Sequence, residues 1–379
     1  MGDSTEVTVD ARLLLALTER AAMFAGADRI HQDVWSIGAN AGAWARGAGL
    51  IVGEPDTPPL ERARFERLAA RVFPAAPADR VTLYTRWLIW LFAFDDARDD
   101  GPVGGSATAV DDLYGHLLMS LRRGGPRPGA DPLELALNEL WRATTPLMSQ
   151  EWRRRFLTHM ERHRAACVEE AVNRRTGRTP SLDEYPALRR RSLGRFLFDL
   201  VEPVLGIEVP ESVVLTAPWQ SLVEGLTDLT AWCNDVASYV VEAARDDPHN
   251  YVTVMATAGA LDPGRTAGRV VDRIAERATE IAAAARSLPA DLTALGVPAR
   301  CARQADDIAA VLVRAQGAHL EWLQDSGRYS PAVPVSVEPI SGGAISGGLV
   351  SAGTTSGGSS PAVPRARGRW TARETPPER

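Results

Sequence analysis

Residues 78–102 read ADRVTLYTRWLIWLFAFDDARDDGP, an apolar and aromatic run that ends in four aspartates within six residues. Apolar residues recur here every three or four positions, which is the spacing of an α-helix. Gly101 and Pro102 are residues that end helices, so the aspartates are expected at the helix C-terminus. Carboxylates are unfavourable there, because they face the negative end of the helix dipole and one another. A nearby cation would offset this cost.

The same three-and-four spacing continues through most of the chain. Segments 60–73, 151–175 and 270–288 are clear examples, and Gly- and Pro-rich breakers separate such segments. Alternating strand patterns with hairpin turns are missing from the sequence. We therefore expect an all-α protein with a single helical domain over residues 1–329. Residues 330–379 are rich in Pro, Gly and Ser and are predicted to form a disordered tail.

The composition restricts the class of protein. Of the 379 residues, 45% are hydrophobic and 24% are charged, which is enough for a large core. Every basic residue is arginine and the net charge is -6, which argues against a nucleic-acid surface. The longest apolar run is well short of the roughly 20 residues that span a bilayer, so we expect no membrane insertion. Three scattered cysteines and the lack of a signal-peptide pattern favour a reduced, cytoplasmic setting.

Two of the aspartates suit a metal ion. Asp95 and Asp99 are four residues apart, so both carboxylates project from one face of the predicted helix. Oxygen ligands in this arrangement suit Mg²⁺, which keeps several waters and bridges to phosphate oxygens. A solvated acidic turn is the simpler interpretation for such a string taken alone. The aromatic residues that lead into it favour a buried location instead.

A second polar pattern, NDVASYVVE, covers residues 234–242. Asn234, Ser238 and Glu242 are spaced four apart and present an amide, a hydroxyl and a carboxylate along one helix face. Polar residues at this spacing are also common on exposed helix faces. Here they lie among apolar residues, so three oxygen ligands on one line would form a second divalent-cation site.

Together the two patterns resemble the signature of the bacterial class I terpene synthases (terpene cyclases). In that family an aspartate-rich DDxxD/E motif faces an NDxxSxxxE motif across one α-helical pocket. DDARD at residues 95–99 is similar to the first motif, and residues 234–242 match the second at every fixed position. The DDPHNYVTVM stretch that follows also resembles the family's downstream segment.

Two further stretches extend the resemblance. Residues 169–194 are similar to the family's segment that leads to its diphosphate-sensing arginine and its helix-break glycine, which map to Arg190 and Gly194. Arg328 and Tyr329 match the family's terminal Arg-Tyr pair. These matches occur in the family's order over residues 87–329, and their combination is far more specific than any one of them.

Two features of the resemblance leave alternatives open. On the residues alone, Arg189, Arg190 and Arg191 are equivalent, and only the family spacing to Gly194 favours Arg190. The residue before the glutamate of the second motif is commonly lysine in the family, and here it is Val241. One basic contact is therefore absent or supplied by an arginine.

The resemblance implies a helical bundle around a central apolar pocket and a Mg²⁺-dependent reaction. An allylic prenyl diphosphate would be ionised, and its carbocation would cyclise to a terpene hydrocarbon or alcohol with release of diphosphate. Three Mg²⁺ ions would be held by Asp95, Asp99, Asn234, Ser238 and Glu242. The residues that the resemblance assigns to catalysis are Asp95, Arg190, Gly194, Arg328 and Tyr329, of which Arg190, Arg328 and Tyr329 would also bind the diphosphate.

Aromatic side chains are expected to line the pocket, because their faces stabilise a carbocation without reacting with it. The main candidates are Trp87, Phe92, Phe94, Phe198, Trp232 and Trp322, and Phe196 and Trp219 are further candidates. Ordinary core packing is the alternative for each of these rings.

The preferred substrate is farnesyl diphosphate, with geranylgeranyl diphosphate second, and a homodimer is one option for the assembly. A prenyl chain-elongating synthase is a rival function, but it would need a second aspartate-rich motif. A class II cyclase would need a DxDD motif, which the sequence lacks. The rival outside the enzymes is a non-catalytic helical binding protein.

Overall fold

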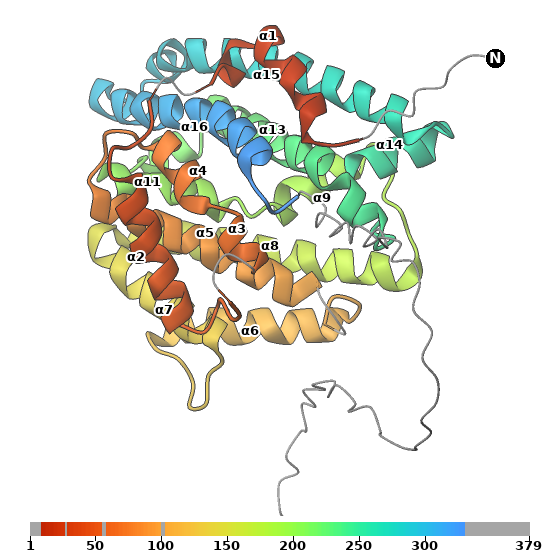
Figure 1. Cartoon of the computed structure of the whole chain (residues 1–379). Coiled ribbons are helices and arrows are strands. Elements are labelled where there is room, and N and C mark those ends of the chain that lie inside the picture. The colour runs from red at the N-terminus through yellow and green to blue at the C-terminus, as the bar shows by residue number, and fades with distance from the viewer. Residues whose placement is uncertain (1–8, 27–28, 55–57, 100–102, 330–379) are drawn as a thin grey trace, which may run out of the picture. The chain divides into compact units, whose positions relative to one another are not determined.

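The structure is a computed structural model that describes residues 9–26, 29–54, 58–99 and 103–329. Within these ranges the chain forms helices and no strands, which confirms the expected all-α class (Figure 1). Gly101, Pro102 and the tail predicted at residues 330–379 lie outside the described residues, so the domain boundary at 329 stays a prediction. No helix in the described part of the chain is long and apolar enough to cross a membrane.

In the described part of the chain, eight helices of at least 13 residues supply most of the architecture. They are α2 (Val34–Gly47), α5 (Ala78–Asp99), α6 (Ala107–Arg123), α7 (Pro132–Thr144), α8 (Gln150–Thr176), α13 (Ala217–Ala243), α15 (Pro263–Ala294) and α16 (Ala299–Asp325). The shorter α-helices are α1 (Ala16–Arg20), α3 (Pro59–Arg62), α4 (Phe65–Val72), α9 (Tyr185–Ser192), α10 (Phe196–Asp199), α11 (Val201–Leu205), α12 (Glu211–Val214) and α14 (Tyr251–Gly259). Single 3-10 turns are η1 (Ala11–Leu15), η2 (Ala22–Phe24) and η3 (Thr145–Leu147).

The long helices form two groups, which lie one above the other in Figure 1. In the first group α13 packs against α15 and α16, and in the second α5 packs against α7 and α6 against α8. The structure has two apolar cores: one is formed mainly by the first group and also includes Val81, Leu88 and Ile89 of α5, and the other lies within the second group. The short helices α4 and α11 each contact both α5 and α16, and so connect the two groups.

Helix α5 is buried on more than one side, which explains its nearly continuous apolar sequence. Trp87, Trp90 and Phe94 belong to the core shared with α6, α7 and α8. The Trp87 indole Nε1 donates a hydrogen bond to the Thr144 hydroxyl at 2.9 Å, and the Phe94 ring lies 4.7 Å from that of Tyr114. A different face of α5 is directed toward the space between the two helix groups.

The helix break expected at Gly194 is present between α9 and α10. Gly194 has φ +86°, a left-handed conformation that side chains with a Cβ rarely adopt. The backbone carbonyl of Ser192, just before the break, accepts a hydrogen bond from His163 Nε2 at 2.8 Å. Since a carbonyl only accepts, Nε2 carries the proton and Nδ1 is left to accept from the Tyr114 hydroxyl. The break is thus held in place from α8.

We expect Gly194→Ala to lower the free energy of unfolding by about 1–3 kcal/mol, because it forces an alanine into left-handed backbone. The new Cβ would also meet the Phe196 ring at 2.8 Å. Gly268→Ala on α15 is the matched control, since it has open space around the new Cβ and should stabilise the helix by about 0.5–1 kcal/mol. Urea unfolding measures both, and a neutral Gly194→Ala would contradict the account of the break.

Candidate active site

A cavity of about 630 Å³ is lined by residues from both helix groups. Along α5 its lining changes from Tyr84 and Leu88, through Phe92, to Asp95 and Asp99 at the helix C-terminus. The neighbouring positions Leu68, Val72, Leu91, Leu193, Leu197, Phe198, Val201, Leu312, Ala315 and Trp322 add further apolar surface. One part of the cavity is therefore apolar, and its other part carries the two motifs found in the sequence.

The acidic motif is neutralised by arginines. Arg98 Nη2 donates to Asp95 at 2.7 Å and to Asp99 at 2.9 Å. Arg328 Nη2 donates to Asp96 at 2.7 Å and lies 4.0 Å from the nearer carboxylate oxygen of Asp95. These are the nearby cations that carboxylates at a helix C-terminus require.

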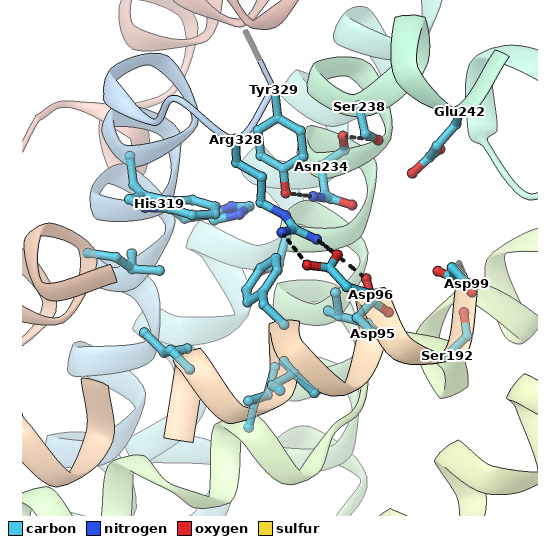
Figure 2. Close-up of a pocket in the computed structure, with 18 of the residues that line it drawn as sticks. Asp95, Asp96, Asp99, Ser192, Asn234, Ser238, Glu242, His319, Arg328 and Tyr329 are labelled. Atoms are coloured by element: carbon cyan, nitrogen blue, oxygen red, sulfur yellow. Dashed lines mark hydrogen bonds and ion pairs between the residues drawn. The ribbon is translucent and has the colours of Figure 1, made fainter. Parts of the chain in front are cut away.

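The second motif lies on α13 and faces the acidic motif across the cavity (Figure 2). The Asn234 amide oxygen accepts from Arg189 at 2.9 Å, and its nitrogen donates to the Tyr329 hydroxyl at 2.8 Å. The Ser238 hydroxyl donates to the backbone carbonyl of Asn234 at 2.8 Å. Asn234, Ser238 and Glu242 all line the cavity, as their spacing of four predicts.

Glu242 has a strongly raised pKa. Burial raises its pKa to about 8, and the negative charge of Asp235 adds to the shift. Asn250 Nδ2 donates to Glu242 at 2.8 Å. Asp235 itself is fully buried behind the cavity wall, where it pairs with Arg189 at 2.8 Å and accepts from the Tyr185 hydroxyl at 2.7 Å. Asp235 therefore positions Arg189 against Asn234.

The structure places Arg190, the arginine expected to sense the diphosphate, outside the cavity lining. The Arg190 guanidinium donates to Asp228 at 2.6 and 2.8 Å. Arg189, one residue earlier, lines the cavity together with Ser192 and Leu193. Adjacent helical residues differ in direction by about 100°, so a shift of one position moves the side chain out of the site.

The donors around the cavity fit a divalent cation bound with its own waters. Carboxylate, amide and hydroxyl oxygens are the ligands that hard cations prefer. Within the described residues, no three His, Cys, Asp or Glu side chains are arranged to hold an ion by themselves. The two motifs would each supply only some of the ligands, and substrate oxygens and water would supply the rest. This is the usual arrangement for Mg²⁺ at phosphate sites.

Only some of the expected aromatic residues line the cavity. Phe92, Phe198 and Trp322 do so. The structure places Trp87, Phe94, Phe196, Trp219 and Trp232 outside the cavity lining, where they pack in the cores or line other hollows. The correction for Trp232 follows from helix geometry, because a residue two positions before Asn234 points to the opposite side of α13.

Several lining residues were missed by the sequence analysis. Tyr84 and Leu88 lie eleven and seven residues before Asp95, and Thr230 lies four before Asn234. These offsets place them within roughly 60° of the motif residues around each helix axis. Counting helical offsets from the motifs would have found these residues, whereas selecting aromatic residue types did not.

His319 on α16 is another missed residue, and Figure 2 shows it near Arg328. Its ring stacks on Trp322 with centroids 5.9 Å apart. Burial lowers the pKa of His319 to about 4, so the imidazole is neutral at pH 7. Arg328 lies over the Phe92 ring at 4.6 Å, which completes a wall of rings beside the charged groups.

The comparisons with known proteins agree with this geometry. Residues 86–280 match the model of terpene synthase family 2, C-terminal metal binding. The (-)-delta-cadinene synthase of Streptomyces clavuligerus is 35% identical over 279 residues, which cover 72% of this chain and 83% of that protein. A (+)-T-muurolol synthase of Roseiflexus castenholzii, named as cyclizing (2E,6E)-farnesyl diphosphate, is 31% identical over 233 residues. The match covers 61% of this chain and 71% of that protein.

The solved structure of germacradien-4-ol synthase from Streptomyces citricolor shares the fold, with a TM-score of 0.68 and 23% identity over 78% of this chain and 95% of that chain. Fold and site define a metal-dependent, all-α enzyme class that acts on prenyl diphosphates. The chain belongs to the bacterial class I terpene synthase family. It is accordingly a terpene cyclase, a lyase that uses a divalent metal.

His319 should make the stability of the protein depend on pH. Its pKa is lowered from 6.5 to about 4, so the unfolded chain takes up the proton first as the pH falls. Stability is therefore lost as the pH falls below 6.5, by about 2 kcal/mol between pH 7 and pH 5. We expect His319→Phe to remove that part of the pH dependence. Urea unfolding of both proteins at the two pH values measures it, and identical pH dependence would contradict the assignment.

Proposed function

We propose that the chain is a Mg²⁺-dependent cyclase of farnesyl diphosphate that releases diphosphate and a cyclic terpene. The observation that carries this proposal is the placement of the two oxygen-rich motifs on opposite walls of one cavity with an apolar interior. The farnesyl substrate is supported by the Roseiflexus relative, which is named as cyclizing (2E,6E)-farnesyl diphosphate. Geranylgeranyl diphosphate remains the second substrate to test.

The proposed metal ligands are those expected from the sequence, namely Asp95, Asp99, Asn234, Ser238 and Glu242. When bound, three Mg²⁺ ions would act as Lewis acids that neutralise the charge developing on the diphosphate. Assembly as a homodimer and a cytoplasmic location stay predictions.

The arginines at the polar part of the cavity would bind and orient the diphosphate. Arg189 and Arg328 line this part, and their planar guanidinium groups match phosphate oxygens well. Arg174 and Arg245 line it too, so arginine replaces the basic contact that Val241 does not provide. The Tyr329 hydroxyl, held by Asn234, adds a donor beside Arg328. These donors converge on the space between the two motifs.

The apolar part of the cavity would shape the prenyl chain and exclude water. Phe92, Phe198 and Trp322 present ring faces to the cavity, each able to stabilise a nearby carbocation by about 0.5–2 kcal/mol. Polar groups also line the cavity here, among them Thr230, whose hydroxyl donates to the Gln316 amide oxygen at 3.2 Å. The Gln316 amide nitrogen donates to the backbone carbonyl of Leu312 at 3.3 Å, so both side chains are held by hydrogen bonds within the protein.

The function is tested by incubating the purified protein with farnesyl or geranylgeranyl diphosphate and Mg²⁺. We expect a cyclic C15 product by gas chromatography and mass spectrometry, and diphosphate release that chelation of the metal stops. Asp95→Asn and Asn234→Ala should each abolish turnover with the helical circular dichroism intact. If only geranylgeranyl diphosphate is cyclised efficiently, the substrate assignment changes from farnesyl to geranylgeranyl diphosphate. Unchanged turnover in both variants would remove the site assignment.

A second experiment separates Arg189 from Arg190. Arg189→Gln should lower kcat/KM by about 100-fold or more, because it removes a charged donor from the reacting group. Arg190→Gln is the matched control one residue away, and its side chain lies outside the cavity. We expect it to change thermal stability while kcat/KM stays within about threefold. The reverse result would restore the arginine expected from the family spacing.

A further inference from the structure

Arg98 lies inside the acidic motif, at a position that the motif does not specify. Its side chain is only 6% exposed, although arginine is rarely buried without partners. The guanidinium donates from Nη2 to Asp95 at 2.7 Å and to Asp99 at 2.9 Å, and from Nε to Asp99 at 3.0 Å. Arg98 thus links the two aspartates that we assign to the metal.

The other edge of the Arg98 guanidinium faces α8. Its Nη1 lies 2.7 Å from Cys167 Sγ and 3.9 Å from a carboxylate oxygen of Glu170. Glu170 is almost fully buried, at 3% exposure. Burial works against its charge, but electrostatic interactions with His249, Arg98 and Arg174 lower its pKa to about 2. Arg98 therefore has a second anion within reach on the side away from the cavity.

Arg98 engages one carboxylate oxygen of Asp95 and both of Asp99. A divalent ion that binds these oxygens would compete with the guanidinium, because the two positive groups repel each other at such short range. Release of Arg98 from the aspartates would strand a buried charge unless another anion received it, which costs several kcal/mol. Glu170 is placed to receive it, since only a short side-chain movement separates the two partners.

We propose that Arg98 is a built-in competitor of the metal, which holds Asp95 and Asp99 until the ion displaces its guanidinium toward Glu170. The inference rests on the proposed assignment of these aspartates as metal ligands. Its consequence is weak binding of the ion alone. An ion that arrives with diphosphate brings additional ligands, so the competition favours loading of metal and substrate together. Arg98 is in this sense a positioning residue.

Metal binding without substrate tests the inference independently of turnover. Mn²⁺ serves as the probe, and its free concentration is measured by electron paramagnetic resonance. Arg98→Gln should lower the dissociation constant about tenfold or more, because it removes the charge-assisted hydrogen bonds that hold both aspartates in the competing state. Glu170→Gln should raise it, because displaced Arg98 loses its receiving anion. The two variants are expected to act in opposite directions.

Arg174→Gln is the matched control. Arg174 lies 3.3 Å from Asp99, and its other ion pairs are with Glu170 and Asp247 rather than with Asp95. The inference requires that Arg98→Gln lower the dissociation constant more than Arg174→Gln does. If the two decreases are equal, or if Arg174→Gln has the larger one, removal of a positive charge alone explains the result and the inference is overturned. If Arg98→Gln fails to fold, Glu170→Gln decides, and unchanged or tighter Mn²⁺ binding there overturns the inference. Asp99→Asn tests the assignment of Asp99 as a metal ligand separately from the role of Arg98. Unchanged Mn²⁺ binding in this variant would contradict the ligand assignment.

Discussion

Carboxylates gathered at the C-terminal end of a buried helix are the constraint on which this site depends. Asp95, Asp96 and Asp99 face the negative end of the α5 dipole and one another, so the fold must bring cations to them. It does so from three places in the chain: Arg98 within α5, Arg174 on α8 and Arg328 after α16. The same electrostatic demand that stabilises the helix end thus assembles the polar part of the cavity.

Hydrogen bonds also connect the second motif to its surroundings. Asn234 links Tyr329, from the segment after α16, to Arg189 on α9, and Asp235 holds Arg189 from behind. Arg328, the neighbour of Tyr329, binds Asp96 on the opposite wall. A continuous set of contacts therefore runs from one motif to the other across the cavity. Arg189 and Arg328 are thus held at the cavity wall by residues of the two motifs.

Much of the fold could be predicted from the sequence, because apolar spacing identifies helices and the spacing of four identifies a shared face. The facing of residues 95–99 and 234–242 was expected only from the family resemblance, since the approach of distant segments leaves no local pattern. Arg190 was expected in the site, but Arg189 lines the cavity instead, because neighbouring helical residues differ by about 100° in direction. Trp87 and Trp232 were expected in the pocket but do not line it. The residue type predicts that a ring is buried, but it does not predict whether the ring faces the cavity or a packed core.

The central claim is that both motifs bind the same group of metal ions. Anomalous diffraction from crystals soaked with Mn²⁺ and inorganic diphosphate tests it most directly, because each bound ion gives its own peak. The account predicts peaks within the cavity of α5 and α13, next to Asp95 and Asp99 on one side and to Asn234, Ser238 and Glu242 on the other. Peaks confined to one motif, or located away from this cavity, would contradict it.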